Sequence, residues 1–171
     1  ADFTVIVEVS SNDTGVIPAA CAFEVNYPLS NISFVDATAG ELGDPVIGPE
    51  ELDFLKAKRR IGSLGDNTNV NPLPVCYTLT FRTAPVLVPP YSIQIGDDPL
   101  SSAPLLATDL VRNIPHTFDN SQLSNIGVVP TPTPISGNAV VRSRIGSGDP
   151  SVPNADFTVI VEVSSNDTGV I

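Results

Sequence analysis

Seventeen residues occur twice in this chain without a single difference. The sequence ADFTVIVEVSSNDTGVI runs from residue 1 to 17 and again from residue 155 to 171. Independent copies would have diverged, so identity indicates that both are the same structural part. We expect the chain to be either one period of a longer array, or a body whose extra strand takes the place of a strand that a neighbouring molecule would supply. The repeat divides the chain into a first copy at 1–17, a body at 18–145, a linker at 146–154 and a second copy at 155–171.

The repeated segment has the pattern of a β-strand with one buried face. Every second residue of its first part is apolar, and β-branched residues, which are stiff in a helix, fit a pleated sheet. Burial of the four apolar side chains of one copy would contribute on the order of 6–12 kcal/mol before ordering costs. We predict that these side chains fill an apolar groove as a donor strand. They are Phe3, Val5, Val7 and Val9 in the first copy and Phe157, Val159, Val161 and Val163 in the second.

Composition favours one globular domain of short strands. The 171 residues are 42% hydrophobic, which is enough for a core, and 17 prolines and 12 glycines indicate many turns. Besides the repeat, we expect strands at 21–27, 32–37, 60–64, 75–82, 86–88, 91–95, 124–129 and 139–145, and short helices at 49–55 and 102–112. The predicted fold is all-β: a jelly-roll or immunoglobulin-like β-sandwich with one or two short helices, completed by an exchanged terminal strand.

The charge balance argues against a nucleic-acid partner. Nineteen acidic residues face eight basic ones, and the formal net charge of −11 repels nucleic acid and anionic membrane surfaces. No apolar run approaches the roughly twenty residues that cross a bilayer, so we expect no membrane insertion. The sequence has no basic-then-apolar leader, so we expect an exported protein to be shown here in its mature form. The predicted location is extracellular, either secreted or at the cell surface.

The two cysteines, Cys21 and Cys76, allow one disulfide or two free thiols. Both lie near the start of an expected strand, which favours a bridge between neighbouring strands. Alternation along residues 75–82, however, puts Cys76 on the face of Thr78 and Arg82, which is expected to be the solvent side. A bridge would need one cysteine outside the regular ladder, which Pro74 permits. A disulfide would imply an oxidising, extracellular setting.

Little in the sequence supports catalysis or a cofactor. His116 is the only histidine, and no serine or cysteine has a nucleophile context, so we do not expect an enzyme. Asp97 and Asp98 offer the hard oxygen ligands that calcium prefers, but they lie outside EF-hand spacing, and aspartate is also an ordinary turn residue. We predict no cofactor, with calcium at Asp97 and Asp98 as the alternative.

The linker GSGDPSVPN at 146–154 leads directly into the second copy. A sandwich domain with a terminal strand on such a tether resembles the subunits of donor-strand-exchange filaments, a class that includes bacterial chaperone–usher pilins and secreted archaeal and bacterial fibre proteins. The resemblance is confined to residues 1–17 and 155–171. It implies that each subunit's incomplete sheet is filled by a neighbour's strand. The implied partners are identical subunits in a head-to-tail homopolymer.

The body has a second resemblance, to the cohesin-type modules of bacterial scaffolding proteins. It rests on AFEVNYPL at 22–29, ISF at 32–34, RRIG at 59–62 and YTLTF at 77–81, and covers roughly residues 1–100. Cohesins usually carry an acid before the proline, whereas here Tyr27 meets Pro28 directly. The resemblance implies a jelly-roll sandwich and, in that family, a dockerin partner. The leading hypothesis is a filament subunit. The alternatives are one repeat of a tandem-domain surface protein or adhesin stalk, and a cohesin-like protein-binding module.

Overall fold

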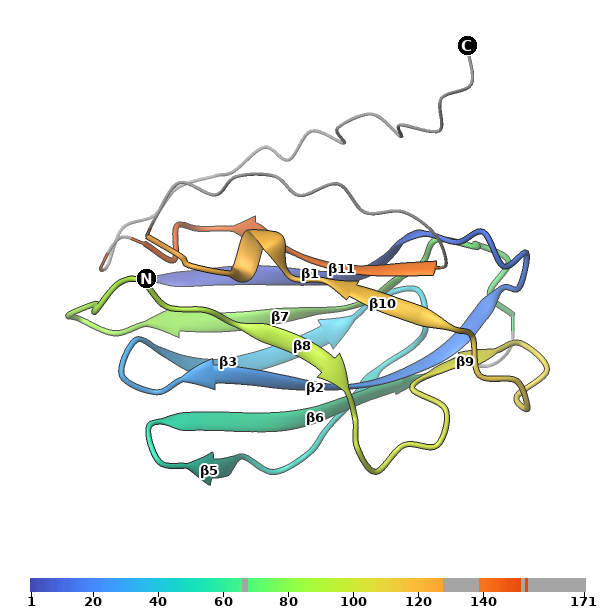
Figure 1. Ribbon diagram of the computed structural model, residues 1–171, viewed down its shortest axis with the longest axis horizontal. Coiled ribbons are helices and arrows are strands. Elements are labelled where there is room, and N and C mark those ends of the chain that lie inside the picture. Colours follow the sequence, from blue (N-terminus) through green and yellow to red (C-terminus); the bar gives the residue numbers. More distant parts are fainter. Residues whose placement is uncertain (66–67, 128–138, 152, 154–171) are drawn as a thin grey trace, which may run out of the picture.

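The computed structural model describes residues 1–65, 68–127, 139–151 and 153 (Figure 1). Apart from one 3-10 turn, η1 (Ser121–Leu123), every regular element in these residues is a β-strand. The strands are β1 (Asp2–Ser11), β2 (Pro18–Pro28), β3 (Ile32–Ala39), β4 (Pro45–Ile47), β5 (Glu51–Asp53), β6 (Lys56–Leu64), β7 (Val75–Thr83), β8 (Gln94–Asp97), β9 (Leu105–Ala107), β10 (His116–Asp119) and β11 (Ala139–Ser147).

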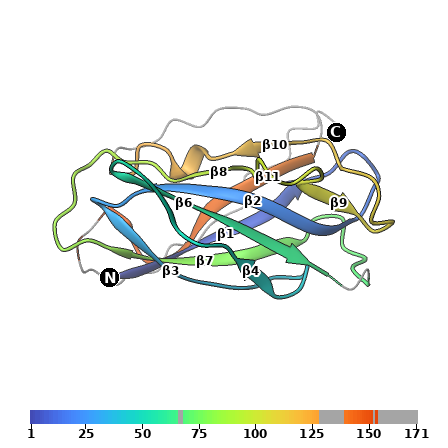
Figure 2. The same cartoon turned by 90° about the horizontal axis from the view of Figure 1, so that it is seen from below.

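The strands form two sheets that lie face to face (Figures 1 and 2). One sheet has the order β10-β11-β1-β7-β3, and the other β4-β6-β2-β8, with β5 added on β6 and β9 on β2. Described neighbours are antiparallel except β10 and β11, which are parallel. This arrangement confirms the predicted all-β sandwich.

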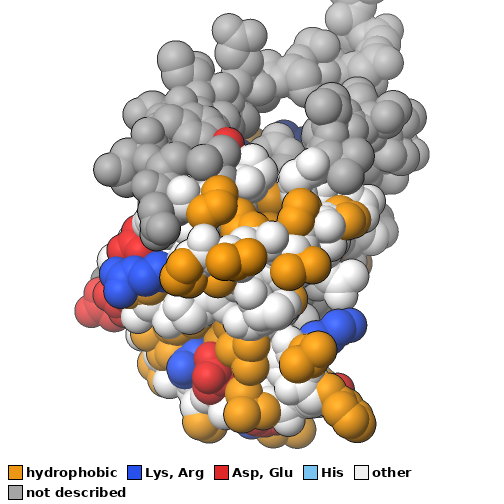
Figure 3. Space-filling model, turned by 90° about the vertical axis from the view of Figure 1, so that its left-hand side faces the viewer, with side chains coloured by type: hydrophobic (Ala, Val, Ile, Leu, Met, Phe, Trp, Pro, Cys, Tyr) orange, Lys and Arg blue, Asp and Glu red, His pale blue; other side chains and the backbone are white. Residues whose placement is uncertain are grey.

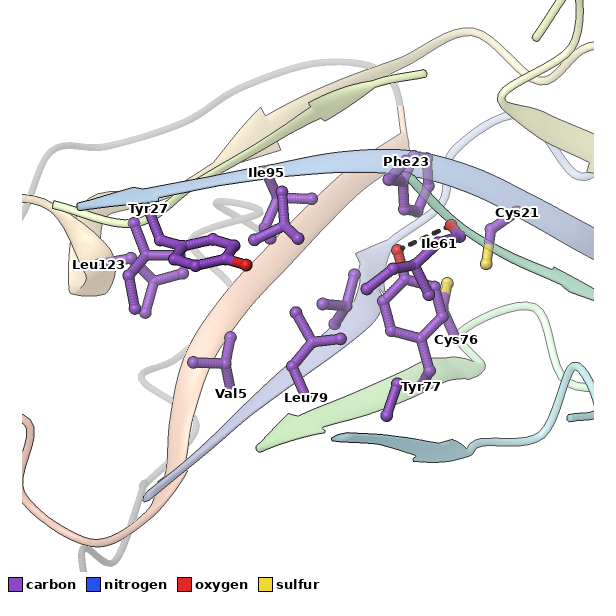
Figure 4. Packing of buried hydrophobic residues seen from close by; sticks show 14 of the residues in the cluster. Val5, Cys21, Phe23, Tyr27, Ile61, Cys76, Tyr77, Leu79, Ile95 and Leu123 are labelled. Atoms are coloured by element: carbon purple, nitrogen blue, oxygen red, sulfur yellow. Dashed lines mark hydrogen bonds between the residues drawn. The ribbon is translucent and has the colours of Figure 1, made fainter. Parts of the chain in front are cut away.

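The core lies between the two sheets and follows from strand alternation. In β2, Phe23, Val25 and Tyr27 point inward, while the residues between them are half-buried on the other face. The Tyr27 ring meets Phe81 of β7 edge-on, with centroids 5.3 Å apart. Such aromatic pairs are worth about 0.5–1.5 kcal/mol beyond the area that they bury. Figure 4 shows this layer, in which the Tyr77 hydroxyl donates a hydrogen bond to the Ile61 carbonyl at 3.3 Å.

Both predicted helices are wrong. Residues 49–55 contain β5, which forms a hairpin with β6 through a turn at Phe54 and Leu55, and residues 102–112 contain β9, which pairs with β2. Helices this short gain little by themselves in water, because nucleation is costly. Pairing with the long strands β6 and β2 supplies hydrogen bonds that an isolated helical turn lacks. Proline and acidic residues at a segment's start therefore did not distinguish a helix from an edge strand.

Two expected strands are loops in the described residues. Residues 86–88 lie between prolines, which donate no hydrogen bond to a sheet. The prediction for 124–129 reduces to one bridge, in which Ile126 exchanges backbone hydrogen bonds with Tyr91, and residues 128–129 lie outside the described part. The strand expected at 91–95 is β8, which begins later, at Gln94.

Candidate functional site: a slot for the repeated strand

The first copy of the repeated segment forms β1, a central strand of the five-stranded sheet. It pairs with β7 from Asp2 opposite Arg82 onward, and with β11 from Thr4 opposite Ser147 onward. We call the position between β7 and β11 the strand slot. A strand in this slot has main-chain partners on both sides, so its removal would leave two unpaired sheet edges. The slot is therefore a site that a strand of suitable sequence must fill.

The apolar side chains of β1 form part of the core. Phe3, Val5, Val7 and Val9 are each 1% exposed or less. The Phe3 ring stacks on Phe81 of β7, with ring centroids 5.7 Å apart. These four residues thus fill the slot of their own body. Their counterparts Phe157, Val159, Val161 and Val163 lie outside the described residues.

The other face of β1 carries polar side chains that bind the slot's walls. Arg144 of β11 donates to Glu8 at 2.8 Å, and the hydroxyl of Thr4 contacts that of Ser147 at 3.0 Å. At the strand's start, Arg82 of β7 donates to Asp2 at 2.6 Å, and this hydrogen bond lowers the pKa of the Asp2 carboxyl. Exposed pairs like this one add little stability. Their geometry matters more for register, since a shift by one residue would turn Phe3 and its companions outward.

Two glycines at the end of β11 leave room for the strand. A Cβ on Gly146 would collide with the Thr4 hydroxyl and stand 3.0 Å from the Ile6 side chain. At Gly148, which has a φ of +73°, a Cβ would lie 2.5 Å from the Asp2 carbonyl oxygen and 2.7 Å from the Phe3 Cβ. Contacts below 3.0 Å force atoms to move. The wall is therefore shaped to the backbone that occupies the slot.

Sequence reasoning missed both glycines, because GSG was interpreted as the start of a linker. The structure instead places Gly146 in β11, which extends to Ser147. Only a pairing partner for residues 139–147 could have revealed their role, and that partner lies at the opposite end of the chain. In the turn after β1, the Asn12 side-chain amide donates to the Val16 carbonyl at 2.7 Å and to the Pro72 carbonyl at 3.1 Å.

Cys21 and Cys76 lie on opposite sheets, in β2 and β7, and both are buried as free thiols. The prediction that Cys76 faces solvent is wrong, since its side chain is fully buried. A β-bulge turns it inward. Opposite β1, Val7 pairs with Tyr77 and the next residue pairs with Val75, so Cys76 has no partner in the ladder.

The calcium candidates do not gather into a ligand cluster. Asp97 accepts a hydrogen bond from the Nε2 of His116 at 2.7 Å, while Asp98 accepts one from the Leu100 backbone amide at 2.9 Å. Among the described residues, no group of three or more histidine, cysteine or acidic side chains is arranged to hold a metal ion. His116 packs its ring against Phe23.

In the described part of the chain, none of the helices has the length and apolar character needed to span a bilayer. No protein-family model matches the chain, and no curated protein does. Among solved structures, the chain is similar to a non-cellulosomal cohesin from the hyperthermophilic archaeon Archaeoglobus fulgidus. The TM-score is 0.41 at 10% sequence identity, over 85% of this chain and 80% of that chain.

Proposed function

We propose that this chain is the structural subunit of an extracellular filament, in which bodies are joined head to tail by exchange of the repeated strand. One observation carries the proposal: the described body has one strand slot, and the sequence that fills it occurs twice in the chain. The side-chain contacts that residues 2–11 make in the slot are equally available to residues 156–165, because the sequences are the same. In the proposed filament, one copy fills its own body and the other serves a neighbouring body.

The end of β11 and the number of residues after it are compatible with this role for the second copy. β11 ends at Ser147, opposite Thr4 at the beginning of β1, and runs antiparallel to it. The residue equivalent to Thr4 in the second copy is Thr158, and residues 148–157 connect it to β11. Ten residues are enough for a loop that returns the second copy alongside β11, in the orientation of β1. Extended, residues 148–154 span at most roughly 25 Å, which limits donation to a body that lies directly at this end.

Replacing one copy of the strand by an identical copy leaves the contacts in the slot unchanged, so the exchange itself does not stabilise a filament. Contact between neighbouring bodies must therefore provide the stabilisation. The end of the sandwich near the start of β1 exposes apolar side chains (Figure 3). They belong to three loops: the β2–β3 turn, the β5–β6 turn and the loop that contains residues 86–88. These loops are linked by hydrogen bonds from the Leu29 amide to the Leu55 carbonyl and from the Asn31 amide group to the Val88 carbonyl. Phe54 is 98% exposed there. The opposite end exposes Val70 and Val111. Two different apolar ends suit a heterologous contact, which produces open chains of subunits.

The Val159→Asp variant tests the donor role of the second copy. We expect the unmodified chain to form fibres, visible by negative-stain electron microscopy, and the variant to remain monomeric in light scattering. A carboxylate has no partner in the apolar slot, so the second copy cannot enter a neighbour. The melting temperature should stay within a few degrees of the unmodified value, because the first copy still fills the slot. Val46→Asp, the same change at a position 73% exposed on β4, is the control. Discrete particles of the unmodified chain, or fibres of Val159→Asp, would refute the proposal.

The Phe54→Asp variant tests the contact between ends. Phe54 contributes little to its own body, so the melting temperature should change by at most a few degrees. Loss of its apolar surface should raise the protein concentration at which fibres appear, on the order of tenfold if one buried side chain contributes about 1.5 kcal/mol. Sedimentation of fibres across a concentration series measures this. An unchanged threshold would show that this end takes no part in assembly.

A tandem array in one long surface protein is the second candidate. The observation that favours it is that the first copy lies within its own body, so that residues 155–171 would begin the next body. In that case the chain alone should be monomeric at every concentration. The second copy would then contribute nothing to the first body, which the paired substitutions discussed below also measure.

A further inference from the structure

The two cysteines meet in the core, although they come from different sheets. Cys21 is 3% exposed and Cys76 is 0% exposed, and both belong to the same cluster of buried residues. Figure 4 shows their sulfur atoms directed toward each other from β2 and β7. A hydrogen bond between the two thiols, together with burial, raises the pKa of Cys76. The two thiols thus face each other across the core without any change of the sandwich.

The local backbone explains how Cys76 reaches this position. Regular alternation allows only one of two successive strand residues to face the core, yet Cys76 and Tyr77 are both buried. The bulge opposite Val7 supplies the extra residue, and Cys76 is that residue. Gly40, which directly follows β3, leaves room for the bulge, since a Cβ there would collide with the carbonyl oxygens of Val75 and Cys76.

We propose that Cys21 and Cys76 form a disulfide that ties the two sheets together in the mature protein. Each thiol loses one proton and the pair loses two electrons as the sulfur–sulfur bond forms. The oxidant is a small-molecule disulfide such as oxidised glutathione, which is reduced to two thiols by successive exchange through a mixed disulfide. Because the folded core excludes such a molecule, the exchange takes place during folding or transient opening.

The bond has a specific consequence for the strand slot, and this part of the inference rests on the proposed function. β7 is one wall of the slot, and it pairs with β1 on one side and with β3 on the other. A covalent tie to β2 holds β7 against the opposite sheet even while no strand occupies the slot. The slot would then keep its shape between the departure of one copy and the arrival of another.

Alkylation followed by mass spectrometry tests the bond in the full chain. The protein is refolded with oxidised and reduced glutathione, denatured, and treated with iodoacetamide before or after reduction. We expect no added group before reduction and two after it. The oxidised form should melt on the order of 10 °C above the reduced form, since the bond closes the long loop between residues 21 and 76. The Cys21→Ala/Cys76→Ala variant is the control, and reductant should not alter its melting temperature.

Two added groups without reduction, or glutathione adducts in place of an internal bond, would overturn the inference. A reductant effect of equal size on the double variant would also overturn it, because the effect would then have another origin. Fibre formation is scored separately. A disulfide in a chain that never forms fibres would confirm the bond and reject the filament. Fibres of a chain with two free thiols would support the filament and reject the bond.

Discussion

The Val5→Asp/Val159→Asp double variant is expected to lose its fold, although each single variant stays folded. Val5 is fully buried in β1, and an unpaired carboxylate there would cost several kcal/mol, comparable with the whole stability of a typical domain. In the Val5→Asp variant, the second copy has the same sequence and the reach to take the slot. In the Val159→Asp variant, the first copy remains in place. Only the double variant has no strand that fits, and circular dichroism against temperature should show no cooperative transition.

The single Val5→Asp variant separates the candidate functions. If its melting temperature falls by no more than a few degrees, the second copy serves the slot, and gel filtration shows whether the strand comes from the same chain or from a neighbour. If Val5→Asp alone unfolds as completely as the double variant, the two copies do not substitute for each other. Strand exchange would then be rejected and the tandem array would remain. Val46→Asp again controls for the added charge.

Features that depend on local pattern could be predicted from the sequence. The alternation from Phe3 to Val9 identifies a strand with one buried face, because the period of two is a property of the strand itself. The hairpin of β5 with β6 could not be predicted in this way. Glu51 begins a segment that also suits a helix, and the pairing of this segment along β6 decides the outcome.

Of the candidate site, only the strand that fills the slot could be predicted from the sequence. Phe3 and the other apolar residues of β1 show the alternating pattern of a strand, whereas the walls of the slot come from β7 and β11, far away in the sequence. Cys76 shows the same limit, since a bulge adds one residue to a strand and reverses the face of everything beyond it. No single-sequence pattern marks that bulge. The need for a residue without a Cβ at position 148 likewise becomes visible only when Asp2 and Phe3 lie beside it.

Gly148→Ala is expected to destabilise the protein even though two copies of the strand are present. The new Cβ would meet the Asp2 carbonyl oxygen and the Phe3 Cβ. If the second copy filled the slot instead, it would bring the same two residue types to this point, because its sequence is identical. Neither strand can therefore relieve the collision. The strained φ and the overpacking together should cost roughly 2–4 kcal/mol. For a chain of this size, that corresponds to a fall of about 5–15 °C in melting temperature, measured by calorimetry.

Gly15→Ala is the matched control for this substitution. Gly15 has a similar φ of +69°, but a Cβ there would have no atom within 4 Å, so only the backbone strain is tested. The difference between the two variants measures the clash with the strand. Equal losses of melting temperature would mean that the contact of residue 148 with the strand adds nothing to the backbone strain. A larger loss at Gly148, together with tolerance of Val5→Asp, would mean that stability depends on an intact slot and not on which copy fills it, which is the condition for joining bodies by exchange.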